Sequence, residues 1–109
     1  MKIYLACPYS HSDEKIMQER FEAVNKKAGE LMIEGHIVFS PISHSHPIQQ
    51  TMGEDTGNLD FWMKQDMPFV ESCDELWVMD IDGWDISEGV LREIAAAEKL
   101  GMDVWWTRP

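Results

Sequence analysis

The chain of 109 residues contains few cysteines, few basic residues and no long apolar run. No apolar stretch approaches the ~20 residues that a membrane-spanning helix needs, so we expect no membrane partner. The first residues predict a strand, not a basic segment followed by a long apolar one, and we expect no secretory signal. Cys7 and Cys73 lie far apart in the sequence and form no metal-binding pattern. We therefore expect reduced thiols in a cytoplasmic protein.

Basic side chains are scarce, because 9 Lys and Arg stand against 20 Asp and Glu, a net charge of −11. A field of this sign repels nucleic-acid polymers and anionic membrane surfaces, and we expect neither as a partner. A small anion can still bind, since the N–H groups of a helix N-terminus attract it locally. The sequence also lacks repeats, low-complexity segments and linkers, and its length predicts one domain over residues 1–109.

What the sequence does contain is a regular alternation of strand and helix patterns. Strands are predicted at 2–7, 36–40, 75–81 and 102–107, and helices at 13–34, 58–72 and 87–100. Residues 41–57 are predicted as a long loop, because they hold two prolines and two glycines. Pro68 inside the second helix predicts a kink or two short helices. The alternation predicts a three-layer α/β fold, Rossmann-like and flavodoxin-like, with an open parallel sheet of four strands in the order 2-1-3-4 and helices on both faces.

In such a sheet the strand order reverses between the first and third strands, and ligands bind at the carboxyl ends of the strands there. The residues that leave the first strand at this point are Pro8, Tyr9, Ser10 and His11. They are expected beside the DGWD turn at 82–85. We expect most of the five tryptophans in the core, but Trp84 in this turn can stack on a nucleobase.

Four polar residues elsewhere have ordinary structural explanations when each is taken alone. Ser87 is a helix cap, and Glu93 lies about 240° further round the helix, so the spacing favours a solvated glutamate. Asp66, in the helix before the third strand, is by itself a surface charge. Tyr4 in the first strand is a core tyrosine with a satisfied hydroxyl.

The SHSHP segment at 43–47 places His44 and His46 two residues apart. Zinc binds such pairs, but the motif supplies no third ligand, and we expect neither a metal nor a cofactor. Two interpretations stay open: the histidines are polar loop residues, or they contact the base or phosphate of a ligand.

Five segments together resemble one family. These are IYLACPYSHSD (3–13), RF (20–21), GHIVFSP (35–41), SHP (45–47) and GWDISEGVLREI (83–94). The family is a set of small bacterial and phage proteins named as domain of unknown function 1937 (DUF1937), and the likeness covers nearly the whole chain. At fold level it resembles the nucleoside 2-deoxyribosyltransferase group, which includes nucleoside 5′-monophosphate N-glycosidases. The resemblance implies an enzyme that acts on nucleosides or nucleotides.

The resemblance also implies roles for individual residues. Glu93 matches the nucleophile, Tyr4 the tyrosine whose hydroxyl supports it, and Asp66 a second catalytic carboxylate. In the monophosphate glycosidases a Ser-x-Gly-x-x-x-Glu string places its serine on the phosphate, and Ser87, Gly89 and Glu93 match it. The transferases carry an aspartate where Ser87 stands, which favours a phosphate-bearing substrate here.

We therefore predict an N-glycosidase that hydrolyses the base–sugar bond of a (deoxy)nucleoside 5′-monophosphate or a related nucleotide. The alternatives are a nucleoside 2-deoxyribosyltransferase and a non-catalytic module that binds or sequesters a nucleotide. His44, His46 and Tyr9 are candidate donors to the leaving base. Exposed apolar residues at 58–72 predict a homodimer. They are Phe61, Trp62, Met63 and Phe69.

Overall fold

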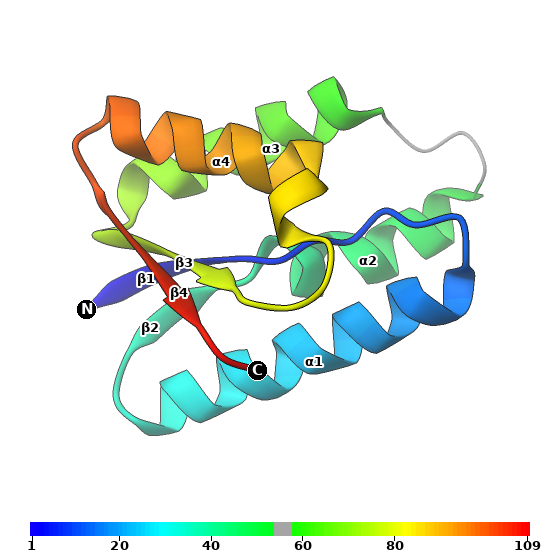
Figure 1. The fold of residues 1–109 in the computed structure, drawn as a ribbon, viewed down its shortest axis with the longest axis horizontal. Coiled ribbons are helices and arrows are strands. Elements are labelled where there is room, and N and C mark those ends of the chain that lie inside the picture. The colour runs from blue at the N-terminus through cyan, green and yellow to red at the C-terminus, as the bar shows by residue number, and fades with distance from the viewer. Residues whose placement is uncertain (54–57) are drawn as a thin grey trace.

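Four parallel strands form one sheet in the order β2-β1-β3-β4, as the alternation predicts (Figure 1). The strands are β1 (Lys2–Ala6), β2 (Ile37–Phe39), β3 (Glu75–Met79) and β4 (Asp103–Thr107). This computed structural model describes residues 1–53 and 58–109. The strand order changes direction between β1 and β3, so the carboxyl ends of these two strands form the crevice in which a ligand is expected.

Helices cover both faces of the sheet, which confirms the predicted α/β class (Figure 1). The helices are α1 (Glu14–Ile33), α2 (Pro41–Met52), α3 (Leu59–Ser72) and α4 (Glu88–Lys99), with a short 3₁₀ helix, η2 (Trp84–Ile86). One core cluster packs the sheet against α3 and α4, and the other packs it against α1.

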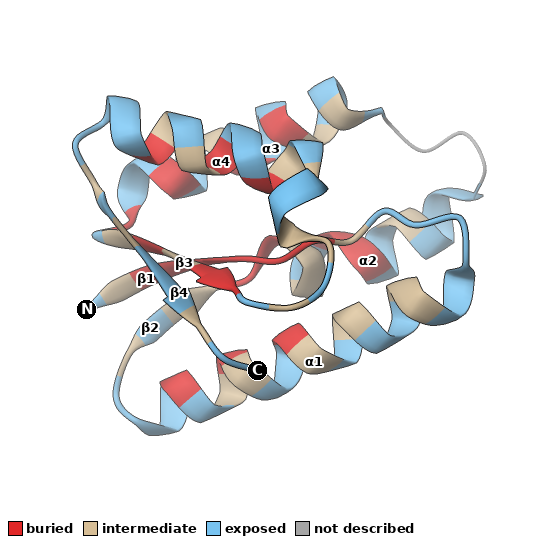
Figure 2. Ribbon diagram, in the orientation of Figure 1, coloured by how far each residue is buried: buried red, intermediate tan, exposed pale blue. Residues whose placement is uncertain are grey.

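Strand β1 is buried on both faces (Figure 2). Because successive side chains alternate between faces, Ile3 and Leu5 pack toward α1, whereas Tyr4 and Ala6 pack toward α3 and α4. A central parallel strand is expected to be apolar throughout, since helices cover both of its sides. The hydroxyl of Tyr4 is the exception, and it points to the α4 side of the sheet.

The prediction of a loop over 41–57 is wrong for most of its length, because residues 41–52 form α2. Pro41 stands at the start of the helix, where a missing N–H costs nothing and the fixed φ angle suits the helix. Burial of Pro41, Ser45 and His46 then overrides the weak helical signal. Gly53 ends the helix at a φ of 76°. The rest of the predicted loop, residues 54–57, lies outside the described residues.

Helix α3 also differs from its prediction. The structure assigns it as one helix that continues through Pro68, so the alternative of two short helices is wrong, whereas the kink stays a prediction. Met63, predicted to be exposed, is buried on the side that faces the sheet, whereas Phe61 and Phe69 are about 40% exposed. The correction follows from helical geometry, because Met63 shares a face with Asp66 and Val70.

The tryptophans are less buried than expected, although Trp77 and Trp84 pack against the two core clusters. None of the five is fully buried, and Trp105 and Trp106 on β4 are exposed. The reason is topological: β4 is an edge strand, so its side chains have neighbours on one side only. Trp84 packs edge-on against Trp106, with ring centroids 5.3 Å apart.

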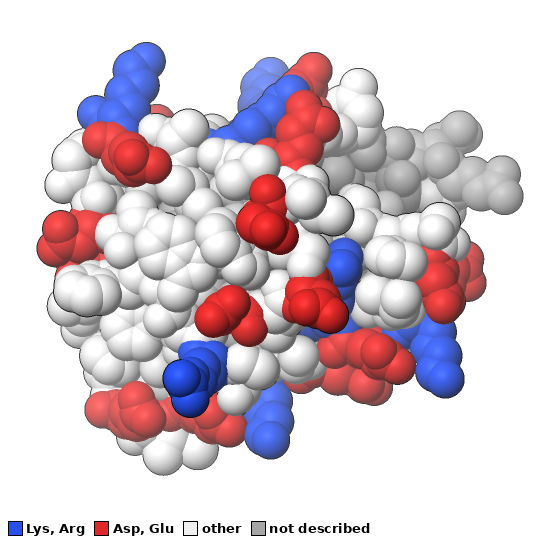
Figure 3. Space-filling view, in the orientation of Figure 1, with Lys and Arg blue, Asp and Glu red and all other residues white. Residues whose placement is uncertain are grey.

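The surface carries the acidic charge that the composition requires, and Asp and Glu side chains are spread over the face seen in Figure 3. Both cysteines are buried and free, in agreement with the expectation of thiols. Among the helices that the structure describes, none is both long and apolar enough to cross a membrane.

Candidate active site

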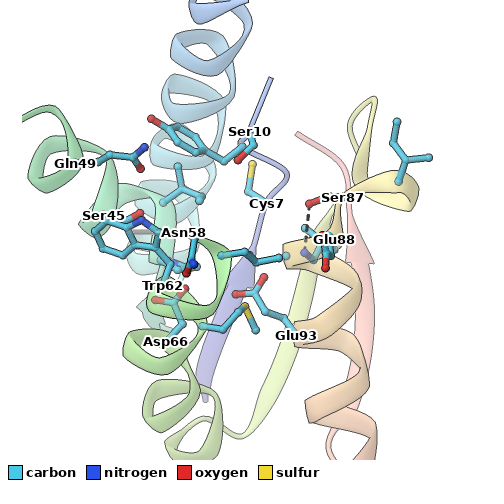
Figure 4. A pocket seen from close by; sticks show the side chains of 18 residues that line it. Cys7, Ser10, Ser45, Gln49, Asn58, Trp62, Asp66, Ser87, Glu88 and Glu93 are labelled. Carbon is cyan, nitrogen blue, oxygen red and sulfur yellow. Dashed lines mark hydrogen bonds between the residues drawn. The ribbon is translucent and has the colours of Figure 1, made fainter. Parts of the chain in front are cut away.

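A cavity of about 450 Å³ opens at the carboxyl ends of β1 and β3, where the strand order predicts a ligand site. Its walls come from the β1–α1 connection, from α2 and α3, and from the start of α4 (Figure 4). A cavity of this size suits a small molecule of nucleotide dimensions. Side chains from distant parts of the chain line this cavity. The acidic side chains Asp66 and Glu93 are the candidates for catalysis.

Glu93 is buried on α4, with 5% of its surface exposed, and one of its carboxylate oxygens accepts a hydrogen bond from the hydroxyl of Tyr4. The spacing from Ser87 indicated a solvated residue, and that interpretation is wrong. Val90, Glu93 and Ala97 form the buried stripe of α4, three and four residues apart, so Glu93 faces the sheet. This periodicity is the sequence signal that identifies Glu93 as an inward-facing residue.

Asp66 occupies the corresponding place on α3 and is 8% exposed. Taken alone it was predicted to be a surface charge, but it belongs to the stripe of α3 that packs on the sheet. Asp66 and Glu93 both line the cavity, and Figure 4 shows the two carboxylates on neighbouring helices pointing into it. Two buried carboxylates with no counter-ion among the described residues are costly, which points to chemistry and not to stability.

The cavity perturbs the protonation of all three groups. Burial raises the pKa of Glu93 to about 8, although the hydrogen bond from Tyr4 acts in the opposite direction and the charge of Asp66 adds to the rise. Burial raises the pKa of Asp66 to about 6. Burial and then the charges of Glu93 and Asp66 also raise the pKa of Tyr4, so its hydroxyl stays a hydrogen-bond donor. Between pH 6 and 8 the two carboxyl groups therefore hold about one proton together.

The start of α4 forms the opposite side of the cavity. Ser87 is the helix cap that the sequence predicts, and its hydroxyl oxygen accepts a hydrogen bond from the Val90 N–H at 3.3 Å. Gly89 also lines the cavity. A Cβ atom added there would lie 3.6 Å from the nearest atom, in Leu59, which is an ordinary contact. Packing within the protein therefore does not require glycine at this position.

The structure separates the remaining predicted binding residues into two groups. Tyr9 and Ser10 line the cavity, whereas Pro8, His11, His44, His46 and Trp84 are not among its lining residues. His46 lies behind Tyr9: its Nδ1 is 2.5 Å from the Tyr9 hydroxyl, and its ring stacks on Phe21.

Two more of these residues have structural roles, and His44 lies at the surface near the rings of Phe39 and Phe69. His11 accepts a hydrogen bond from the Asp13 N–H at the start of α1. Trp84 packs against the core cluster of the α3 and α4 side. His44 is exposed. Of the two histidines in the SHSHP segment, His46 is the one whose side chain contacts a cavity-lining side chain, that of Tyr9.

A family model described as "Domain of unknown function (DUF1937)" matches residues 1–108. The chain belongs to the DUF1937 family. Among solved structures, this family member is similar to a 2-deoxyribosyltransferase from Bacillus psychrosaccharolyticus, with a TM-score of 0.71 and 28% sequence identity. The match covers 100% of this chain and 73% of that one. No curated protein matches the sequence.

Sequence reasoning missed the cavity residues that the second helix contributes in this DUF1937 protein. Ser45 and Gln49 line the cavity from α2, and Asn58 and Trp62 line it from the start of α3. Ser45 and Gln49 were missed because the loop prediction covers residues 41–52, and a loop has no helical face on which to place them. Within residues 1–53 and 58–109, no group of three His, Cys, Asp or Glu side chains is placed to hold a metal ion.

Proposed function

We propose that this protein cleaves the N-glycosidic bond of a nucleoside 5′-monophosphate by hydrolysis. The observation that carries the proposal is the buried carboxylate of Glu93, which accepts a hydrogen bond from Tyr4 and shares a cavity with Asp66. The likeness to a 2-deoxyribosyltransferase supports it, because transfer and hydrolysis both begin by breaking the bond between sugar and base.

The proposed reaction has two steps. A carboxylate oxygen of Glu93 attacks C1′ from the side opposite the base, the C1′–N bond breaks, and a glycosyl ester forms. The base takes its electron pair and a proton from Asp66. Water then attacks C1′, its proton passes to Asp66, and the carboxylate of Glu93 is released. Asp66 thus acts first as an acid and then as a base. Because the pKa of Glu93 is higher than that of Asp66, the reaction starts from the less populated form, in which the shared proton lies on Asp66 and Glu93 is ionised.

Tyr4 prepares Glu93 for this role. Its hydroxyl donates to the carboxylate and so favours the ionised form, which burial alone would suppress. Tyr9 lines the cavity and contacts His46, so these two stay candidates for a hydrogen bond to the leaving base.

The phosphate is assigned to the start of α4. Ser87 and Gly89 line the cavity there, and the first N–H groups of a helix are free to bind an anion. Ser87 uses its oxygen as the helix cap, which leaves its O–H available as a donor. The string that the sequence shares with monophosphate glycosidases supports the same assignment.

A second candidate function is transfer of a deoxyribosyl group between bases. It is favoured by one observation: none of the described residues that line the cavity is Lys, Arg or His, so the site suits a neutral nucleoside as well. The glycosyl ester on Glu93 would then be attacked by a second base in place of water.

The test is incubation of the protein with a panel of nucleosides and nucleotides, with products separated by chromatography. Free base without an acceptor supports hydrolysis, and a new nucleoside formed only with an added base supports transfer. Binding without any product indicates a non-catalytic module. Glu93→Gln should lower turnover by roughly a hundredfold or more, because it removes the charge that meets the oxocarbenium-like centre. Glu98→Gln, an exposed change on the same helix, is the matched control.

A further inference from the structure

Arg20, on α1, connects two loops that are far apart in the sequence. One guanidinium nitrogen donates to the carbonyl oxygens of Ser10 at 3.2 Å and Tyr9 at 3.5 Å. The other donates to the carbonyl oxygen of Asp82 at 3.1 Å. No ion pair within the described part of the chain involves Arg20. Its donors are directed to backbone carbonyls, so it acts as a clamp between loops and not as a surface charge.

These two loops are walls of the proposed active site. The first follows β1 and supplies Tyr9 and Ser10 to the cavity. The second follows β3 and continues through η2 to Ser87. Figure 4 shows Ser10 and Ser87, from these separate segments, at the same end of the cavity, away from Asp66. Strand pairing between β1 and β3 ends at Ala6 and Val78, so the ladder does not fix the loops beyond that point.

Gly83 fits the clamp closely. Its φ of 96° lies in the left-handed region, and a Cβ atom there would stand 2.6 Å from the terminal nitrogen of Arg20. The guanidinium therefore occupies the space that a side chain at 83 would need. A planar, rigid fork can serve three carbonyls at once, which the single ammonium of a lysine cannot do in the same geometry.

We propose that Arg20 is a positioning residue that fixes the Ser10 wall against the Ser87 wall and thereby sets the affinity of the cavity for the phosphate end of its substrate. The identity of the substrate rests on the proposed function, whereas the clamp itself does not. Arg20 acts through the loop backbones, because it does not line the cavity.

Hydrogen exchange tests the clamp without any ligand. Arg20→Lys and Arg20→Gln should speed exchange of the amides at 9–12 and 82–87 by about tenfold or more, and leave those of β1 and β3 unchanged. Lys26→Gln is the matched control, since Lys26 is an exposed cation on the same helix. Unchanged exchange in both loops of a folded Arg20 variant overturns the proposal. If Arg20→Gln does not fold, Arg20→Lys decides.

Binding and kinetics test the consequence for the substrate. In Arg20→Lys the KM for the best 5′-monophosphate, and the Kd for 2-deoxyribose 5-phosphate, should rise about tenfold. The kcat and the KM for the matching nucleoside should change less than threefold. An equal loss for nucleotide and nucleoside overturns the assignment to the phosphate end. If the wild type neither releases base nor binds the sugar phosphate, the proposed function fails, and hydrogen exchange alone decides whether the clamp exists.

A second variant tests the contact with Gly83. Gly83→Ala should itself speed exchange in both loops, because the new methyl group displaces the guanidinium. In an Arg20→Gln background the same change should have a smaller effect, since the clashing group is gone. Independent, additive effects of the two changes would contradict the proposed fit between Arg20 and Gly83.

Discussion

At the scale of single residues, Tyr4, Asp66 and Glu93 form a buried polar group in an otherwise apolar region between the sheet, α3 and α4. Burying carboxyl groups lowers stability unless they are neutral or well hydrogen-bonded. Only Glu93 has a hydrogen-bond partner among the described side chains, which is Tyr4. The arrangement therefore carries an energetic cost that depends on pH.

Glu93→Gln should be more stable than the wild type at high pH. The pKa of Glu93 is about 8 in the folded chain and 4.5 normally, so the folded state binds the proton more tightly. Wild-type stability should therefore fall as pH rises from about 4.5 to 8, and the glutamine variant escapes this loss. Urea unfolding should show a gain of up to about 5 kcal/mol at pH 9, since each pKa unit between the two states corresponds to about 1.4 kcal/mol, and the gain should shrink toward zero at pH 4.5. A gain that does not depend on pH would contradict the raised pKa.

Tyr4→Phe should shift the pH dependence of the reaction. In the wild type, kcat/KM should follow a bell-shaped profile with limbs near pH 6 and 8, because the reaction needs one proton on the Asp66–Glu93 pair. Loss of the Tyr4 hydroxyl removes a hydrogen bond that favours ionised Glu93, so the pKa of Glu93 should rise and the high-pH limb of the profile should move to higher pH. The loss of rate should be smaller than in Glu93→Gln. A profile of unchanged midpoint would show that Tyr4 does not tune Glu93.

At the scale of elements, α3 and α4 share one arrangement of buried side chains. Each places a carboxylate in the middle of a buried stripe, Met63-Asp66-Val70 in one helix and Val90-Glu93-Ala97 in the other. The apolar members pack on the sheet and fix the helix rotation, which aims the carboxylate at the cavity. The N-terminus of α4 then brings its free N–H groups to the same cavity.

Gly89→Ala, at the start of α4, should weaken nucleotide binding without lowering the stability of the fold. The added methyl group meets only ordinary contacts, and alanine favours a helix over glycine by about 1 kcal/mol, so stability should be unchanged or slightly raised. Because position 89 lines the cavity, affinity for a 5′-monophosphate should fall about tenfold. Thermal unfolding and calorimetry measure the two effects. Unchanged affinity would indicate that the phosphate does not bind at the start of α4.

At the scale of the whole molecule, the two layers of helices leave one apolar surface on α3. Phe61 is 40% exposed, and Trp62 is partly exposed next to it, with the two rings edge-on at 5.0 Å. Phe69 is similarly exposed but stacks on Phe39 at 4.0 Å, so it has a partner within the chain. Phe61 and Trp62 are therefore the better candidates for an interface.

We predict a homodimer through this part of α3. Light scattering at tens of micromolar should give twice the monomer mass, and Phe61→Ser should lower it because the variant removes an apolar contact. Leu100→Ser, an equally exposed apolar position at the end of α4, is the control and should leave the mass unchanged. A monomeric wild type would contradict the prediction.

The local pattern of the sequence determined the strand order, the cap at Ser87 and the position of the ligand crevice. The cap follows from contacts between residues near in sequence. The strand order pairs Ile3 of β1 with Glu75 of β3, and it could be predicted because the alternation of strand and helix patterns is typical of a doubly wound parallel sheet. Tertiary structure decided the rest. Tyr4 and Glu93 are 89 residues apart, and only packing of α4 on the sheet brings the hydroxyl to the carboxylate. Burial of Asp66, formation of α2 and the clamp of Arg20 likewise depend on partners distant in sequence, whose positions no local pattern encodes.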